Sequence, residues 1–230
     1  MITYEEFLRI FPHNTEELAG EIYDNEFENI QIKKRHIAIK NLTRIFEATL
    51  SLSNSKGFRS MSLRDLSKEV GITMGGLYLY FKSKDDLIDL IENQSIRMTK
   101  RIIMDIDIAS LPPRQALRDV IQYYLYLSES NRQWLYFLYM ETKNFSLAQK
   151  KKAMDLELFV EDIFVDILDR GVSRGDFRIG NTRISASMIV ALLMEWFLKR
   201  HKYYKRNVSI DQYVAYVIES IERIVLPGIS

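Results

Sequence analysis

Side chains that can bind an anion gather between residues 62 and 84 of this 230-residue chain. Hydroxyl and cationic groups donate hydrogen bonds to phosphates and to base edges, which is the chemistry of a nucleic-acid contact. The candidate contacts are Ser62, Arg64, Thr73, Met74, Gly75, Gly76, Tyr78, Tyr80 and Lys84. A basic run ahead of them, made of Lys33, Lys34 and Arg35, is expected either to enter a neighbouring minor groove or to act only as a phosphate anchor.

The sequence shows no arrangement of catalytic residues. It has no cysteine, which excludes disulfides, thiol nucleophiles and cysteine-ligated metals. The three histidines, at positions 13, 36 and 201, have no paired metal-ligand spacing, and no Glu-x-x-His, phosphate loop or nucleophile elbow is present. We therefore expect a protein that is not an enzyme and that needs no cofactor and no metal.

Charge is distributed unevenly along the chain, although the formal net charge is only +1. Residues 1–30 carry eight acidic side chains and one arginine, for a net of −7, whereas residues 31–84 carry eleven lysines and arginines against three acidic residues, for +8. Concentrated positive charge is typical of a module that binds a polyanion, although a solvated basic face gives the same pattern. The acidic segment is expected either to fold over the basic one and weaken non-specific DNA binding, or to be a capping helix or a disordered arm.

Two short helices are expected to position the candidate contacts. Ser62-Leu-Arg-Asp65 is a capping-box pattern that starts the first helix, which must end at Gly71 because glycine accepts positive φ without steric cost. Thr73 caps the second helix, whose inward residues are Leu77 and Phe81. Two eight-residue helices joined by a three-residue turn make a helix-turn-helix, whose second helix enters the major groove of DNA.

The second helix has an unusual reading surface. Tyr78 and Tyr80 cannot both face inward beside Leu77 and Phe81, so at least one tyrosine is expected on the groove side; the alternative is an aromatic side chain packed on a neighbouring helix. The run 74–76 offers no side-chain hydrogen-bond donor. Direct base readout should therefore be sparse, and we expect specificity to depend on DNA shape and on the basic run at 33–35.

The segment is similar to the amino-terminal domain of the TetR family of bacterial regulators. The resemblance is carried by Gly57-Phe58, Ser62-Leu63, Leu66, Gly71-Ile72-Thr73, Gly76-Leu77-Tyr78, Tyr80-Phe81 and Lys84-Asp85-Asp86-Leu87. It implies contacts to bases or nearby phosphates from the positions that match Thr73, Met74, Gly75, Tyr78 and Tyr80. It also implies backbone contacts from Arg64 and Lys84, with a solvated lysine as the alternative for the latter.

By the same resemblance, the rest of the chain is a helical domain that binds a ligand and forms a dimer. We expect an all-α fold with an acidic extension at residues 1–30, a three-helix DNA-binding domain at 31–84 and a helical bundle at 85–230. Dense aromatic residues between positions 122 and 145 favour an apolar effector cavity. For any one of them, a plain aromatic core is the alternative. The candidate effector contacts are Tyr123, Tyr126, Trp134, Phe137, Met140, Phe159, Phe164 and Met188.

Residues 184–198 are apolar almost all round, which a helix at the edge of a monomer cannot be without a partner. With residues 214–225 they predict a four-helix interface across a two-fold axis. The candidate interface residues are Ile184, Met188, Ala191, Leu192, Glu195, Val214, Ile218 and Ile221, with Glu195 paired across the interface. The runs at 196–200 and 209–213 resemble the branch of the family that responds to fatty acids and acyl-coenzyme A.

Together these features predict a cytoplasmic, homodimeric regulator that binds a palindromic operator in double-stranded DNA. It is most simply a repressor released by a small apolar or aromatic effector, although an activator would use the same parts. A structural DNA-binding protein without an effector is the alternative of another class. No signal peptide or membrane-spanning run is evident, so no membrane partner is expected.

Overall fold

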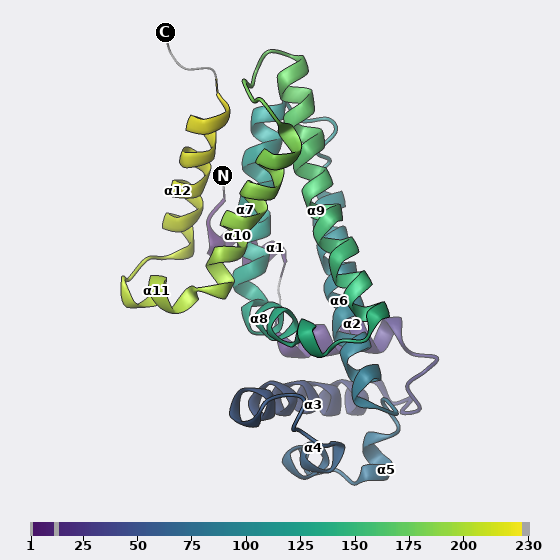
Figure 1. Ribbon diagram of the computed structural model, residues 1–230. Helices are drawn as coiled ribbons and strands as arrows, with labels where there is room; N and C mark the ends of the chain where they lie inside the picture. Colours follow the sequence, from purple (N-terminus) through teal and green to yellow (C-terminus); the bar gives the residue numbers. More distant parts are fainter. Residues whose placement is uncertain (1, 12–13, 227–230) are drawn as a thin grey trace. The chain divides into compact units, whose positions relative to one another are not determined.

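The computed structural model describes residues 2–11 and 14–226. Every regular element among these residues is a helix, as the sequence predicts, and Figure 1 shows their order. The chain forms two compact units. We call residues 12–97 and 133–151 the helix-turn-helix unit, and residues 1–11, 98–132 and 152–230 the bundle unit. No helix of the described part of the chain is long and apolar enough to cross a membrane.

The helix-turn-helix unit is built around one long helix. Its elements are α2 (Thr15–Asn25), α3 (Arg35–Lys56), α4 (Leu63–Val70), α5 (Met74–Leu77), the first part of α6 (Lys84–Asp105), most of α8 (Arg132–Glu141) and the 3-10 turn η1 (Thr142–Asn144). Helix α3 buries Leu42, Ile45 and Phe46 completely, on one face. It ends at Gly57, whose φ of 82° no other residue type adopts easily.

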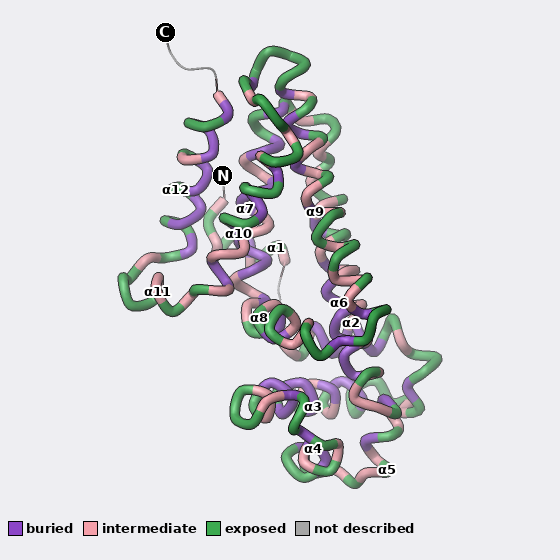
Figure 2. Tube along the Cα trace, in the orientation of Figure 1, coloured by how far each residue is buried: buried purple, intermediate pink, exposed green. Residues whose placement is uncertain are grey.

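The bundle unit is organised around α7 (Pro113–Ser130), which contacts α1 (Tyr4–Ile10), α10 (Thr182–Leu198) and α12 (Ile210–Val225). The end of α6, most of α9 (Leu147–Ser173) and the short α11 (Arg200–Lys205) complete it. Proline at the first position of α7 costs nothing, because that residue has no intrahelical hydrogen bond to lose. Figure 2 shows buried and exposed positions on opposite sides of α12. That helix therefore buries one face within its own subunit.

The acidic residues at the amino terminus do not form one extension. Phe7 of α1 is fully buried in the core of the bundle unit, where its ring centre lies 5.7 Å from that of Tyr123 and 5.5 Å from that of Tyr126. Ile22 of α2 is fully buried in the other core. The bounds of the two compact units thus differ from the boundaries expected at residues 30 and 84. The reason is that α1 and α2 each place their apolar residues in a different core. Of the described residues 2–11 and 14–30, most belong to α1 and α2, so a disordered arm is not observed there.

A carboxylate joins α12 to α7 in the bundle unit. Glu222, whose side chain is 10% exposed, accepts hydrogen bonds from Arg118 at 2.6 and 2.7 Å and from Arg114 at 2.8 and 3.2 Å. The hydrogen bonds from Arg118 and then Arg114 lower the pKa of this carboxyl group to about 2. Both oxygens of this almost buried carboxylate therefore accept hydrogen bonds from arginine.

We predict that Glu222→Gln lowers the free energy of unfolding by about 2–3 kcal/mol at neutral pH. Because the folded pKa lies below the unfolded value near 4.5, this stabilisation is present above pH 4.5 and is lost as the pH falls toward 2. Urea titrations at pH 7 and pH 3 should therefore show a smaller difference between variant and wild type at pH 3. Glu219→Gln on the same helix, where an exposed pair with Arg223 is broken, should cost under about 0.5 kcal/mol at either pH.

Candidate nucleic-acid interface

The turn between α4 and α5 follows the local signals in the sequence. Ser62 Oγ accepts from the Asp65 amide at 3.2 Å, and the Ser62 amide donates to Asp65 Oδ2 at 2.8 Å, which completes the capping box. Lys56 Nζ lies 2.7 Å from the same carboxylate, and this bond, followed by those from Ser62, holds the pKa of Asp65 well below its usual range. Gly71 takes the left-handed conformation that ends α4. Helix α4 is thereby fixed at both ends.

Helix α5 presents a small, smooth surface to solvent. Thr73 caps it by accepting from the Gly76 amide at 3.0 Å, and Leu77 and Phe81 are buried in the core. Gly75 is exposed and Tyr78 is 44% exposed, while Met74 and Gly76 are half-buried. The expected helix of eight residues is wrong: α5 has four, because two adjacent glycines favour the unfolded backbone and the chain continues in turns from Tyr78.

Only one of the two tyrosines lies on the exposed side. Tyr80 is 5% exposed, and its hydroxyl accepts a hydrogen bond from Asn41 Nδ2 of α3 at 2.8 Å. Burial raises the pKa of this hydroxyl, so it stays protonated. The candidate DNA contact at Tyr80 is therefore corrected: the side chain is used inside the unit, and Tyr78 is the exposed tyrosine. Asn41 was not anticipated, because nothing near it in the sequence marks its partner.

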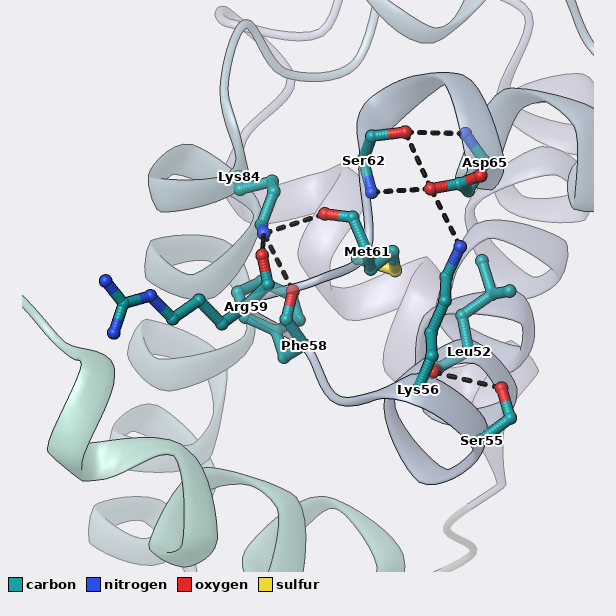
Figure 3. Close-up of polar contacts among 9 residues, drawn as sticks. All are labelled: Leu52, Ser55, Lys56, Phe58, Arg59, Met61, Ser62, Asp65 and Lys84. Carbon is teal, nitrogen blue, oxygen red and sulfur yellow. Dashed lines mark hydrogen bonds and ion pairs between the residues drawn. The ribbon is translucent and has the colours of Figure 1, made fainter.

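Lys84 has an internal role that the sequence did not reveal. Figure 3 shows its ammonium group among three backbone carbonyls: Nζ donates to Phe58 O at 2.7 Å, Arg59 O at 3.0 Å and Met61 O at 2.8 Å. It also lies 4.7 Å from the centre of the Phe58 ring. An ammonium group has three hydrogens, so these bonds leave none for a phosphate. Lys84 thus holds the loop between α3 and α4, and burial lowers its pKa.

We predict that Lys84→Met lowers the free energy of unfolding by about 1–3 kcal/mol, because three carbonyl oxygens lose a charged donor. The neighbouring Lys82→Met, which changes an exposed lysine, should change stability by under about 0.5 kcal/mol. Chemical denaturation of the two variants checks this difference. Full stability of Lys84→Met, combined with weakened DNA binding, would restore the phosphate contact and contradict the structural role.

Among the other basic candidates, the side chains of Lys33 and Arg35 bind groups of their own unit, whereas those of Lys34 and Arg64 bind none among the residues that the structure describes. Lys33 Nζ donates to Phe27 O at 2.7 Å and to Ile30 O at 2.9 Å, so it is held by the chain that precedes it. Arg35 is held by Asp24 of α2. Lys34 and Arg64 are exposed. Exposed Arg59 was missed as a candidate; in Figure 3 its side chain extends away from the carbonyl cluster around Lys84.

A hollow of about 300 Å³ lies beside Tyr78, and its charged lining residues are Glu26, Lys82, Asp86 and Asp89. Three carboxylates against one lysine make the interior of this hollow an unsuitable place for a phosphate. The exposed surface formed by Thr73, Gly75 and Tyr78, with Arg64 on the preceding helix, is the better one.

The candidate effector residues do not form one cluster. Tyr123, Tyr126, Phe159 and Phe164 belong to the core of the bundle unit or pack against it. Trp134 and Phe137 are buried in the helix-turn-helix unit, where their rings meet Phe46 at 5.7 Å and Phe58 at 5.4 Å. Met140 and Met188 are exposed. The dense aromatic stretch thus supplies two separate cores, because α7 and α8 belong mainly to different units.

The candidate dimer residues are also divided. On α10, Ile184, Met188, Ala191 and Leu192 form one exposed face, while Glu195 is half-buried and pairs with Lys202 of its own subunit. On α12, by contrast, Val214, Ile218 and Ile221 are buried in the bundle core, so the expected face of this helix is corrected. The large apolar residues that α12 exposes are Tyr216 and Ile224.

A capped helix, a left-handed glycine and a short second helix with an exposed glycine and tyrosine define a helix-turn-helix DNA-binding protein. The model for bacterial regulatory proteins of the tetR family matches residues 45–91, and that for a tetracyclin repressor-like C-terminal domain matches residues 110–204. The chain belongs to the TetR family and is a transcriptional regulator rather than an enzyme.

Similar proteins agree with this family. A fatty acid metabolism regulator protein of Bacillus subtilis is 24% identical over 165 residues, which are 69% of this chain and 84% of that protein. A tetR-family regulatory protein from Rhodococcus RHA1 superimposes with a TM-score of 0.72 at 19% identity, over 82% of this chain and 98% of that one. The regulator FadR of Bacillus subtilis, solved with stearoyl-CoA, has a TM-score of 0.59 at 21% identity, over 77% and 96% of the two chains.

Proposed function

We propose that this chain is a repressor that binds a palindromic operator as a homodimer and releases it when a small, largely apolar effector binds. The exposed surface of α5, with Gly75 and Tyr78 free of contacts that would bury them, is the observation that carries the DNA-binding part. One such surface reads one half-site. Two of them, about 34–36 Å apart on a dimer, match successive major grooves.

The exposed face of α10 supports the dimer. Met188 and Ile184 are each 60% exposed, and Leu192 is 43% exposed one turn further along. Apolar side chains that recur every four residues on a surface helix favour association with a second apolar face. A two-fold axis would place this face against its own copy, with Tyr216 and Ile224 of α12 as neighbours that the sequence did not suggest.

We propose a fatty acid or an acyl-coenzyme A as the effector. The support comes from the similarity of this chain to a fatty acid metabolism regulator of Bacillus subtilis and to the structure of FadR from the same organism, solved with stearoyl-CoA. Within this chain, Tyr123, Tyr126, Phe159 and Phe164 remain the candidates, since all four belong to the bundle unit. Such a ligand lowers the affinity for DNA if it binds more tightly to the conformation that cannot bind the operator. The largest possible loss is the ratio of the ligand's affinities for the two conformations.

Selection of bound duplexes from a random library tests the DNA-binding part. We expect an inverted repeat whose half-sites are about 10 base pairs apart, bound by two chains. Acyl-coenzyme A of several chain lengths is then added to the complex, and the longer chains should dissociate it. Binding without sequence preference and without any response to these ligands would favour a structural DNA-binding protein.

Met188→Lys tests the dimer. A lysine at this exposed position should leave the helix content unchanged and convert the dimer to a monomer, as measured by analytical ultracentrifugation. Met154→Lys on α9, which is 62% exposed, is the matched control and should remain dimeric. A dimeric Met188→Lys would place the interface elsewhere.

A further inference from the structure

The acidic helix α2 is a folded part of the helix-turn-helix unit. Helix α2 buries Leu18, Ile22 and Tyr23 in the same core as α3, and the Tyr23 hydroxyl donates to Lys33 O at 3.1 Å. At Gly20 the two helices come close: a Cβ atom there would lie 3.5 Å from Nη2 of Arg35. The guanidinium group of Arg35 therefore lies against the surface of α2.

Asp24 of α2 holds this guanidinium group in a forked pair. Arg35 Nε donates to Oδ1 at 3.0 Å and Nη2 donates to Oδ2 at 2.7 Å. Two parallel bonds to a pair of oxygens are also the way in which arginine binds a phosphate. Both side chains are more than half exposed, at 59% and 55%, so water and dissolved anions reach the pair. Exposed ion pairs of this kind are weak and are screened by salt.

The chain around Arg35 contacts the segment that follows the reading helix α5. The Gln31 amide donates to Leu79 O at 2.9 Å, one residue beyond Tyr78, and Asn41 donates to the Tyr80 hydroxyl at 2.8 Å. Residues on both sides of Arg35 in the sequence thus contact the segment that follows α5. A DNA backbone that passes α5 would come within reach of a long arginine side chain released from Asp24.

We propose that Asp24 takes the place of a DNA phosphate: it occupies Arg35 in the free protein and is displaced by the DNA backbone when the duplex binds. Asp24 then weakens binding to every duplex, because Arg35 must exchange one anion for another. Operator DNA tolerates this loss because its base contacts persist, whereas non-specific DNA depends on phosphate contacts alone. The inference rests on DNA binding through α5.

The test measures the affinity of the full chain for a duplex of random sequence at several salt concentrations. Asp24→Asn keeps the shape of the side chain and removes its charge, so Arg35 binds the phosphate without first leaving an anion. We expect binding about two- to fivefold tighter than that of the wild type at about 50 mM salt. Because salt screens the Asp24–Arg35 pair, this advantage should shrink at about 200 mM salt, and log K should fall more steeply with log salt for the variant.

Two further variants separate the pair from general charge effects. Glu16→Gln removes the same charge from an exposed position on α2 and should leave the slope unchanged. Arg35→Gln should weaken binding more in the Asp24→Asn background than in the wild type. Equal effects of Asp24→Asn and Glu16→Gln, or an Arg35→Gln effect that is the same in both backgrounds, would overturn the proposal. The wild-type titration reports separately on DNA binding itself, and no duplex binding by the wild type would overturn both.

Discussion

Alanine at position 75 is expected to weaken operator binding about tenfold, the effect of losing one good base contact, while the chain folds as before. Glycine costs a helix about 1 kcal/mol relative to alanine, so its presence in a four-residue helix needs a reason. The protein itself provides none, since a Cβ atom at Gly75 would meet only Thr73 Oγ1, at 3.9 Å. We therefore expect the close approach that excludes a side chain to come from DNA.

Thermal denaturation and operator titration of Gly75→Ala check this prediction. We expect an unchanged or slightly raised melting temperature and weaker binding to the operator. Gly76→Ala is the comparison. Its Cβ atom would lie 3.3 Å from Thr73 Oγ1, so it disturbs the cap of α5 and should lower stability as well. If Gly75→Ala binds the operator as tightly as the wild type, α5 does not approach DNA through this face.

Alanine at position 171 is expected to destabilise the bundle unit by about 3 kcal/mol or more, because the core cannot accept another carbon atom. A Cβ atom on Gly171 would lie 1.9, 2.4 and 2.7 Å from three ring atoms of Phe177, which is 4% exposed. The ring has little freedom to move away. The amides of Asp176 and Phe177 both donate to Gly171 O, at 2.9 and 3.1 Å, and fix the turn after α9.

Urea denaturation measures this effect against Gly180→Ala. At Gly180 no atom lies within 4 Å of the added Cβ, and the backbone has no positive φ, so the substitution should change stability by under about 0.5 kcal/mol. Similar stability of the two alanine variants would show that Phe177 repacks freely, contrary to its burial.

The starts and ends of the helices around the reading segment were predictable from the sequence. The signals are the capping residues Ser62, Asp65 and Thr73 and the helix-ending Gly71. Each acts on a backbone amide or a φ angle within a few residues, so its effect does not depend on the rest of the fold. The predicted length of α5 was wrong, because Gly75 and Gly76 weaken a short helix that has only four residues.

The uses of the charged and aromatic side chains were not predictable in the same way. Lys84 and Phe58 are 26 residues apart in the sequence, and their contact exists only because α6 begins beside the loop after α3. Trp134 and Phe137 follow Tyr126 closely in the chain but are buried in a different core. The sequence of a helix does not specify which other helix its apolar residues will pack against.

The sequence by itself therefore determined that this protein is helical, where its helix-turn-helix begins and turns, and which chemistry its surface offers to DNA. Those properties follow from capping, periodicity and charge, which are local. Only the tertiary structure decided that Tyr78 rather than Tyr80 is exposed, that Lys84 binds carbonyls, that Arg35 binds Asp24 and that α12 buries the face expected in a dimer. These outcomes depend on which elements pack together, and packing joins residues that are distant in sequence.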